Sequence, residues 1–456
     1  NTWEVTDMKN IRQEIQEAAP FSPMGWNSWD SFGASVTEAE LLENAEYMAQ
    51  HLKKYGWEYV VCDIQWYEPE ADSAGYHKFT ELCMDEYSRL LPAVNRFPSA
   101  ADGKGFKPIA DRIHEMGLKF GLHMMRGIPR QAVHENRKIL GTEATARQIA
   151  HPASLCSWNT DMYGIDTDRE GAQAYYDSVF ALYASWGVDY VKVDDICHTY
   201  YTPEAPRCAA RELEMIHRAI LNSGRKMVLS VSPGPAQLSD GAVLQQNANL
   251  WRMTDDLWDD WADVKAMFER CQEWQEYVGD GNWPDCDMLP LGHIGIRSGS
   301  RGVGDRYTRL TQDEQKTMMT LWSMFRSPLM FGGNLKDNDE FTNQLLTNSG
   351  ILKMHRDGRN AREIYREEDV VIWKSSTEDE KTVFVAVFNL NDKAKKVRLL
   401  PHVLQLQDAR NLPAFYAGLE IWTAETVSVP GLARIAAPEI PIPAHGVVCY
   451  RFQLDE

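Results

Sequence analysis

Two pairs of aspartates follow apolar segments of the chain and could carry acid–base chemistry. Residues 190–195 read Tyr-Val-Lys-Val-Asp-Asp, and residues 251–256 read Trp-Arg-Met-Thr-Asp-Asp. Cleavage of a glycosidic bond needs two carboxyl groups, one that attacks the anomeric carbon and one that protonates the leaving oxygen. Two such strand ends in one sheet therefore indicate a hydrolase pocket.

A structural interpretation of the same aspartates competes with the catalytic one. An aspartate after a strand is more often a turn residue or a helix N-cap, because its side chain accepts hydrogen bonds from free backbone N–H groups. Lys192 and Arg252 favour the catalytic interpretation. Each cation lies inside an apolar segment, before Asp194 and Asp256 respectively, where its burial is costly unless a cleft or a partner carboxylate receives it.

The elements that must position these groups follow a regular order up to about residue 355. Short apolar runs alternate with helical patterns, such as residues 37–55 and 105–116, as in a parallel sheet covered by helices. The first of these helices is expected to open with a capping box formed by Thr37 and Glu40. The expected strands are residues 23–29, 59–66, 119–125, 190–196, 227–233, 250–256, 285–289 and 327–333. Eight such strands close a (β/α)8 TIM barrel, an α/β fold whose reacting groups lie at the carboxyl ends of the strands.

Four aspartates are expected at those carboxyl ends: Asp63, Asp194, Asp256 and Asp287. After about residue 356 the helical periodicity disappears. Residues 370–373, 382–389, 396–400, 419–422 and 447–452 are short runs separated by turn residues, which predicts an antiparallel β-sandwich. The predicted domains are a catalytic barrel over residues 1–355 and a C-terminal antiparallel β-sandwich over residues 356–456.

Composition and charge limit the range of partners. Hydrophobic residues make up 44% of the chain and charged residues 25%, as in a folded protein. The formal net charge of −19 argues against a nucleic-acid or anionic-membrane partner, because phosphates bind to clustered cations. No apolar stretch is long enough to span a bilayer. An oligosaccharide or glycoside substrate is the expected partner, and the oligomeric state stays open.

The cysteines and the first residues say little about metal or compartment. The eight cysteines show no metal spacing such as Cys-x-x-Cys. The chain opens with Asn1, Thr2 and Trp3 and without a methionine. An extracytoplasmic location, secreted or periplasmic, is therefore an expectation if a leader has been removed, and the localisation is otherwise unknown.

Five motifs occur in order along the chain and together resemble glycoside hydrolase family 27, the family of α-galactosidases and α-N-acetylgalactosaminidases. They are Met-Gly-Trp-Asn-Ser-Trp at residues 24–29, Lys-Val-Asp at 192–194, Trp-Arg at 251–252 followed by Asp256, Pro-Asp-Cys-Asp-Met-Leu at 284–289 and Ser-Pro-Leu-Met at 327–330. The resemblance implies the barrel-plus-sandwich fold that the residue pattern predicts. It also implies a retaining double displacement without a metal or a cofactor.

By this resemblance Asp194 is the nucleophile and Asp256 the general acid/base. Lys192 is expected to keep Asp194 ionised, while a less solvated Asp256 holds its proton for donation. The two carboxyl groups of a retaining enzyme are expected to lie about 5 to 5.5 Å apart.

The remaining site residues are expected to bind the sugar. The resemblance matches Arg252 to an arginine near C2, and Lys192, Asp63 and Trp29 to residues that bind ring hydroxyls and form the pocket floor. His123 stands where galactosidases usually have tyrosine, and it either binds a hydroxyl or is an ordinary strand-end histidine. The full expected set of binding residues is Trp29, Asp63, Ile64, His123, Lys192, Ser232, Arg252 and Asp287. Ser232 stands where the family has a bulkier loop, which leaves the preference at C2 open.

Ile64 departs from the family pattern at a position that bears on the choice of substrate. Family galactosidases carry Asp-Asp-x-Trp after the second strand, whereas here the run is Asp63-Ile64-Gln65-Trp66. An isoleucine facing a sugar hydroxymethyl leaves a buried hydroxyl unpaired at a cost of about 1 to 3 kcal/mol. β-L-Arabinopyranose is D-galactopyranose without that carbon, and an apolar residue here resembles the β-L-arabinopyranosidases of the family.

The expected function is therefore a retaining exo-glycosidase for terminal β-L-arabinopyranosides and the configurationally equivalent α-D-galactopyranosides. One alternative is a plain α-galactosidase, or less readily an α-N-acetylgalactosaminidase. Others are an inactive carbohydrate-binding protein and a transferase that uses the same covalent intermediate. The natural polymer and its linkage stay open.

Overall fold

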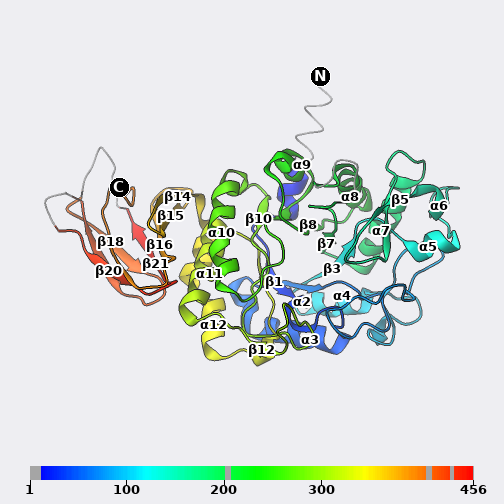
Figure 1. Cartoon of the computed structure of the whole chain (residues 1–456), viewed down its shortest axis with the longest axis horizontal. Coiled ribbons are helices and arrows are strands. Elements are labelled where there is room, and N and C mark those ends of the chain that lie inside the picture. The colour runs from blue at the N-terminus through cyan, green and yellow to red at the C-terminus, as the bar shows by residue number, and fades with distance from the viewer. Residues whose placement is uncertain (1–11, 201–206, 407–412, 432–435, 455–456) are drawn as a thin grey trace, which may run out of the picture. The chain divides into compact units, whose positions relative to one another are not determined.

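A computed structural model describes residues 12–200, 207–406, 413–431 and 436–454 (Figure 1). The chain divides into two compact units, and each is described by itself. The first, called the barrel unit, comprises Asn1–Trp258, Asp280–Thr308 and Met330–Asn338; the second, called the sheet unit, comprises Asp259–Gly279, Arg309–Leu329 and Asp339–Glu456. The predicted boundary between residues 355 and 356 stays a prediction.

An eight-stranded parallel sheet forms the barrel and confirms the predicted fold class. Its strands are β1 (Met24–Asn27), β2 (Tyr59–Cys62), β3 (Lys119–Met125), β7 (Tyr190–Asp194), β8 (Val228–Val231), β9 (Leu250–Arg252), β10 (Trp283–Asp285) and β13 (Leu329–Phe331). Their order is β10-β9-β8-β7-β3-β2-β1-β13. A parallel bridge between Leu289 and Phe331 joins the two ends of this order. Seven of these strands lie within segments expected from the sequence, whereas β10 shares only Asp285 with the segment expected at residues 285–289.

The strands are apolar because both faces of the sheet are covered. All four residues of β2, for example, are buried, as expected of a parallel strand between a barrel interior and a layer of helices. The described helices of the barrel unit are α2 (Trp29–Phe32), α3 (Glu38–Tyr47), α4 (Lys107–Glu115), α5 (Arg130–Glu135), α6 (Ala146–Ile149), α7 (Ala172–Trp186), α8 (Ala210–Ser223) and α9 (Gly241–Asn247).

The start of α3 confirms the expected capping box. The Thr37 side chain accepts from the backbone N–H of Glu40, and the Glu40 carboxylate accepts from the backbone N–H of Thr37. The helix continues as a π turn over Met48–Leu52 and a 3-10 turn over Lys53–Tyr55. The predicted segment is thus helical throughout, but only its first part is α-helical.

Two long connections follow the carboxyl ends of β2 and β3 and carry side chains into the site. The connection after β3 contains a small antiparallel sheet with the order β4-β6-β5, formed by β4 (Ile128–Pro129), β6 (Met162–Ile165) and β5 (Ala150–Leu155). A two-stranded antiparallel sheet, formed by β11 (His293–Ile294) and β12 (Arg306–Tyr307), follows β10.

The sheet unit contains the C-terminal antiparallel β structure predicted from the sequence. Its strands are β14 (Arg359–Glu367), β15 (Val370–Ser376), β16 (Thr382–Asn389), β17 (Lys395–Arg398), β18 (Phe415–Glu420), β19 (Thr426–Pro430), β20 (Glu439–Ile442) and β21 (Val447–Gln453). Six of them form a sheet in the order β14-β15-β16-β21-β18-β19, and β17 pairs with β20. The unit also holds α10 (Trp261–Trp274), α11 (Gln312–Phe325), α12 (Glu340–Thr347) and α13 (Ser349–Asp357).

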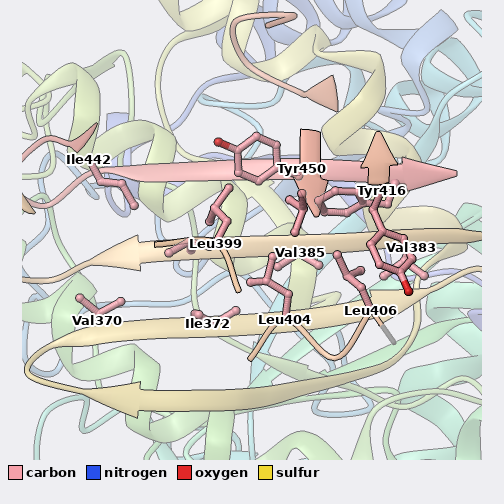
Figure 2. Close-up of a cluster of buried hydrophobic side chains, with 13 residues drawn as sticks. Val370, Ile372, Val383, Val385, Leu399, Leu404, Leu406, Tyr416, Ile442 and Tyr450 are labelled. Atoms are coloured by element: carbon pink, nitrogen blue, oxygen red, sulfur yellow. The ribbon is translucent and has the colours of Figure 1, made fainter. Parts of the chain in front are cut away.

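A single apolar cluster joins the two β layers of this unit. Figure 2 shows Ile372 and Val385 from the six-stranded sheet together with Leu404 and with Ile442 of β20. These side chains are buried. The sequence pattern missed β14, β19 and β20. β14 is an edge strand whose many charged residues lack the alternation typical of a half-buried strand.

Candidate active site

A hollow of about 320 Å³ lies at the carboxyl ends of the barrel strands. Nine of the ten predicted site residues line it: Trp29, Asp63, Ile64, Lys192, Asp194, Ser232, Arg252, Asp256 and Asp287. The tenth, His123, is buried behind Asp194. The structure therefore brings the predicted residues together from β1, β2, β3, β7, β8, β9 and β10 or the turns that follow them.

Asp63 and Lys192 form a buried ion pair at one wall of the hollow. Lys192 Nζ donates to Asp63 Oδ2 over 2.9 Å, and Asn27 Nδ2 donates to the same oxygen over 2.8 Å. Burial of the carboxyl opposes its ionisation, but Lys192, His123 and the backbone N–H of Ile64 together outweigh this and hold the pKa of Asp63 well below its usual range. The cost of burying Lys192 is thus offset by the partner that the sequence required.

Asp194 ends β7 and is held by two hydrogen-bond donors. His123 Nε2 donates to Asp194 Oδ2 over 2.9 Å, and the backbone N–H of Asp195 donates to Oδ1 over 2.9 Å. The ring must carry its proton on Nε2, because an ionised carboxylate can only accept. Burial opposes ionisation of Asp194, but His123 and Lys192 together lower its pKa below the usual value. Asp194 is therefore an ionised carboxylate at neutral pH.

Arg252, the last residue of β9, is buried between the carboxyl groups of Asp256 and Asp287. Its Nη2 contacts Asp256 Oδ1 at 3.0 Å and Asp287 Oδ2 at 2.9 Å. Asp287 also accepts from the backbone N–H of Leu257 over 2.8 Å and from that of Met288 over 2.7 Å. Burial raises the pKa of Asp287, and Arg252 opposes this rise. The three side chains thus form one charged network.

Of the two candidate catalytic carboxyl groups, that of Asp256 is the more exposed to solvent, contrary to the expectation. The side chain of Asp256 is 64% exposed, whereas that of Asp194 is 16% exposed. The expectation that Asp256 is the less solvated of the two is wrong. The reason is that Asp256 lies beyond the end of β9 in the turn that follows the strand, whereas Asp194 is the last residue of β7.

Ile64 and Ser232 complete the predicted set. Ile64 is only 1% exposed, and its backbone N–H donates to Asp63 Oδ1 over 2.8 Å. Its side chain gives the hollow an apolar wall beside the Asp63 carboxylate. Ser232 is buried after β8, and its backbone oxygen accepts from the N–H groups of Ile196 and Cys197 over 3.1 Å each.

Sequence reasoning missed several residues that line the hollow. Tyr76 comes from the connection after β2 and stacks on Trp29, with ring centroids 6.2 Å apart. Burial and the nearby carboxylates of Asp194 and Asp63 raise the pKa of Tyr76. Trp158 comes from the connection after β3 and lies beside Tyr76 at 5.8 Å. Neither connection has a periodic pattern, so only aromatic content could have pointed to them.

Asp30 also lines the hollow and escaped notice because it follows the first motif directly. It is buried, and its Oδ2 has no hydrogen-bond partner. Burial and the nearby charge of Asp287 raise the pKa of Asp30 well above the usual value. Among the described residues no cluster of three or more histidine, cysteine or acidic side chains could hold a metal ion. Within the same residues no helix is long and apolar enough to cross a bilayer.

Solved structures that resemble this chain include a glycoside hydrolase family 27 β-L-arabinopyranosidase from Geobacillus stearothermophilus. It is 53% identical, with a TM-score of 0.91 over 96% of this chain and 98% of that chain. A variant of that enzyme in complex with arabinose gives a TM-score of 0.92 over 97% of this chain and 99% of its own. A Bacillus halodurans protein, provisionally assigned as an α-N-acetylgalactosaminidase, is 51% identical, with a TM-score of 0.83 over 95% of this chain and 97% of that chain.

Curated sequences and a family model agree with the structures. An α-galactosidase from Cyamopsis tetragonoloba is 25% identical over 426 residues, which cover 92% of this chain and 84% of that protein. The family model described as α-galactosidase A matches residues 160–357. With 53% identity over nearly the whole of a family 27 enzyme, the chain is a glycoside hydrolase and belongs to glycoside hydrolase family 27.

Proposed function

We propose that this chain is a retaining exo-glycosidase that hydrolyses terminal β-L-arabinopyranosides and the configurationally equivalent α-D-galactopyranosides. The observation that carries the proposal is Ile64, whose buried side chain lines the hollow beside Asp63. An apolar wall at this place penalises a sugar hydroxymethyl and fits a sugar that lacks one. The 53% identical relative from Geobacillus stearothermophilus, a β-L-arabinopyranosidase, supports the same substrate.

Asp194 is the proposed nucleophile. Its carboxylate lines the hollow, and its lowered pKa keeps it ionised for attack on the anomeric carbon. This attack forms a covalent glycosyl ester and breaks the bond to the leaving oxygen. We assign His123, which contacts Asp194 rather than the hollow, to holding this carboxylate in place.

Asp256 is the proposed general acid/base. In the first step it gives a proton to the leaving oxygen, and in the second it takes a proton from the water that attacks the ester. Its exposure places it at the solvent edge of the hollow, where the leaving group of a bound substrate covers it.

The remaining predicted residues bind the terminal sugar. Asp63 and Lys192 present a carboxylate and an ammonium group to ring hydroxyls, and Arg252 and Asp287 do the same from the other wall. Trp29, which also lines the hollow, offers an apolar ring to the sugar face, and the buried Ser232 leaves room near C2. A hollow of about 320 Å³ suits one terminal residue, which supports exo action.

A panel of nitrophenyl glycosides tests the substrate. The wild-type enzyme should prefer 4-nitrophenyl β-L-arabinopyranoside over the α-D-galactoside by about five- to 150-fold in kcat/KM, the equivalent of one unpaired hydroxyl. Equal or faster turnover of the galactoside would mean an α-galactosidase. A preference for the α-N-acetylgalactosaminide would reassign the C2 specificity, and no turnover of any glycoside would leave a carbohydrate-binding protein.

Replacing the two carboxyl groups tests their roles. Asp194→Ala and Asp256→Ala should each lower kcat more than about 100-fold, since each removes a nucleophile or general acid. Azide should rescue Asp194→Ala and yield a glycosyl azide of inverted configuration, because a small anion takes the place of the carboxylate. Proton NMR of the first-formed sugar from the wild type should show retention. Inversion would mean that water, and not Asp194, attacks the sugar.

A further inference from the structure

Three aromatic rings form a row along one side of the hollow. Trp29 stacks on Tyr76 with ring planes 20° apart, and Trp158 lies beyond Tyr76 with its ring centroid 5.8 Å away. Trp29 and Tyr76 are partly buried, whereas Trp158 is 39% exposed. Of the four aromatic side chains that line the hollow, Trp158 is the one exposed to solvent, since the fourth, Trp258, is buried.

The turn that carries Trp158 is anchored rather than loosely attached. Cys156 and Asn159, which lie on either side of Trp158 in the sequence, are both buried. Asn159 Oδ1 in turn accepts from the backbone N–H of Asp161 over 3.0 Å. The ring of Trp158 therefore projects from a preorganised turn, so a partner that stacks on it has little chain to order.

The position of Asp256 shows which part of a substrate reaches Trp158. A general acid must contact the glycosidic oxygen, and Asp256 is 64% exposed at the edge of the hollow. The terminal sugar thus occupies the inner part of the hollow, and everything beyond the glycosidic oxygen extends over the exposed edge. Trp158 lines the same hollow and is exposed to solvent, so it is available to the leaving group.

We propose that Trp158 is the platform of a leaving-group subsite and stacks on the first sugar ring beyond the scissile bond. The ligand class is a pyranose, whose C–H face packs on the apolar indole ring while its hydroxyls stay in water. This inference rests on the proposed function and deepens it, because a leaving group that is a sugar makes an oligosaccharide the substrate of the site.

The test compares two leaving groups attached to the same sugar. β-L-Arabinopyranosyl fluoride has no ring beyond the scissile bond, whereas the (1→3), (1→4) and (1→6) β-L-arabinopyranosyl-D-glucose disaccharides have one. For the disaccharide that the wild type cleaves best, Trp158→Ala should lower the ratio of its kcat/KM to that of the fluoride by about three- to tenfold, the value of one aromatic stack. Trp158→Phe, which keeps an aromatic face, should restore most of the ratio.

Phe79 supplies the matched control. It is a solvent-exposed aromatic side chain, 78% exposed, and it lines a different hollow of the barrel unit. Phe79→Ala should leave both kcat/KM values unchanged. An unchanged ratio in Trp158→Ala would overturn the subsite, and so would a wild type that cleaves the fluoride but none of the disaccharides. A wild type that cleaves neither this fluoride nor α-D-galactosyl fluoride would instead refute the proposed function.

Discussion

The side chain of Ile64 is an apolar group among the carboxylates and cations of the hollow. Ile64→Asp places an acceptor where a galactose hydroxymethyl would lie. The ratio of kcat/KM for the galactoside to that for the arabinopyranoside should therefore rise by about five- to 150-fold, as one unpaired hydroxyl gains a partner. Initial rates with the two nitrophenyl glycosides measure this ratio.

Ile64→Leu is the control for volume, because it keeps an apolar side chain of the same size. It should retain the preference for arabinopyranose. If Ile64→Asp changed both kcat/KM values equally, the side chain would not discriminate between the two sugars, and the substrate assignment would lose its main support.

The hydrogen bond from His123 to Asp194 predicts a pH effect. His123→Phe removes a donor to a buried carboxylate while roughly keeping the shape of the ring. Because that donor lowers the pKa of Asp194, its loss should raise this pKa, and the acid limb of the kcat/KM profile should move to higher pH. A hydrogen bond to a charged group is worth about 1.5 to 3 kcal/mol, which corresponds to about one to two pH units.

His123→Tyr is the companion variant, since its phenol can still donate to the carboxylate. Its acid limb should move less than that of His123→Phe. A pH profile of kcat/KM that is identical in the wild type and His123→Phe would mean that the histidine does not control ionisation of the nucleophile.

At the scale of elements, the turn after β7 depends on a buried group of charges behind the hollow. Asp195 has a φ of 54°, a left-handed conformation that few residues other than glycine, asparagine and aspartate adopt. Arg126 Nε donates to the backbone oxygen of Asp195 over 2.7 Å, and its Nη2 contacts Asp195 Oδ2 at 3.0 Å. Arg126 Nη1 also contacts Glu212 of α8 at 2.6 Å.

This arrangement predicts different outcomes for two substitutions at Asp195. An asparagine at this position tolerates the left-handed conformation, and its side-chain oxygen can still accept from Arg126. An alanine is strained in that conformation and has no side-chain acceptor. The alanine variant should be at least about 1 to 2 kcal/mol less stable to urea than the asparagine variant. Its kcat should also fall further, because the N–H of residue 195 holds Asp194 Oδ1.

The KM of both Asp195 variants should change little, since Asp195 does not line the hollow. Equal kcat values in the two variants would mean that the geometry of this turn does not control the position of the nucleophile.

At the scale of the whole molecule, helices that follow barrel strands in the sequence belong to the sheet unit. Phe268 of α10 packs against Phe388 of β16 with ring centroids 4.8 Å apart. Trp422 Nε1 donates to Thr320 Oγ1 of α11 over 3.0 Å, and Glu314 contacts the ring of His445 at 2.9 Å. Residues on both sides of position 355 therefore share one core.

A chain truncated after residue 355 should consequently fail to fold. It would expose buried side chains of α10 and α11, each of which contributes about 1.5 to 3 kcal/mol when covered. We expect a low soluble yield, and no cleavage of 4-nitrophenyl β-L-arabinopyranoside under conditions in which the full chain is active. A soluble and active fragment would instead show that the barrel folds alone and would support a domain boundary at that residue.

Local patterns in the sequence determined the elements of this protein and the ends at which its chemistry lies. The apolar runs at residues 59–66 and 119–125 predicted strands because parallel strands are buried on both faces. The capping pair Thr37 and Glu40 predicted the start of α3 because it satisfies backbone N–H groups within a few residues. Both signals depend on neighbours in the chain, so the sequence contains them in full.

Only the tertiary structure decided which side chains meet and which remain in water. Lys192 pairs with Asp63 across 129 positions of the chain, and no spacing rule specifies that contact. Tyr76 and Trp158 reach the hollow from irregular connections. The expectation that Asp256 is the less solvated carboxyl group was wrong, because its exposure depends on how far the turn extends beyond β9. Burial and distance are properties of the packed molecule, and residues distant in sequence set them jointly.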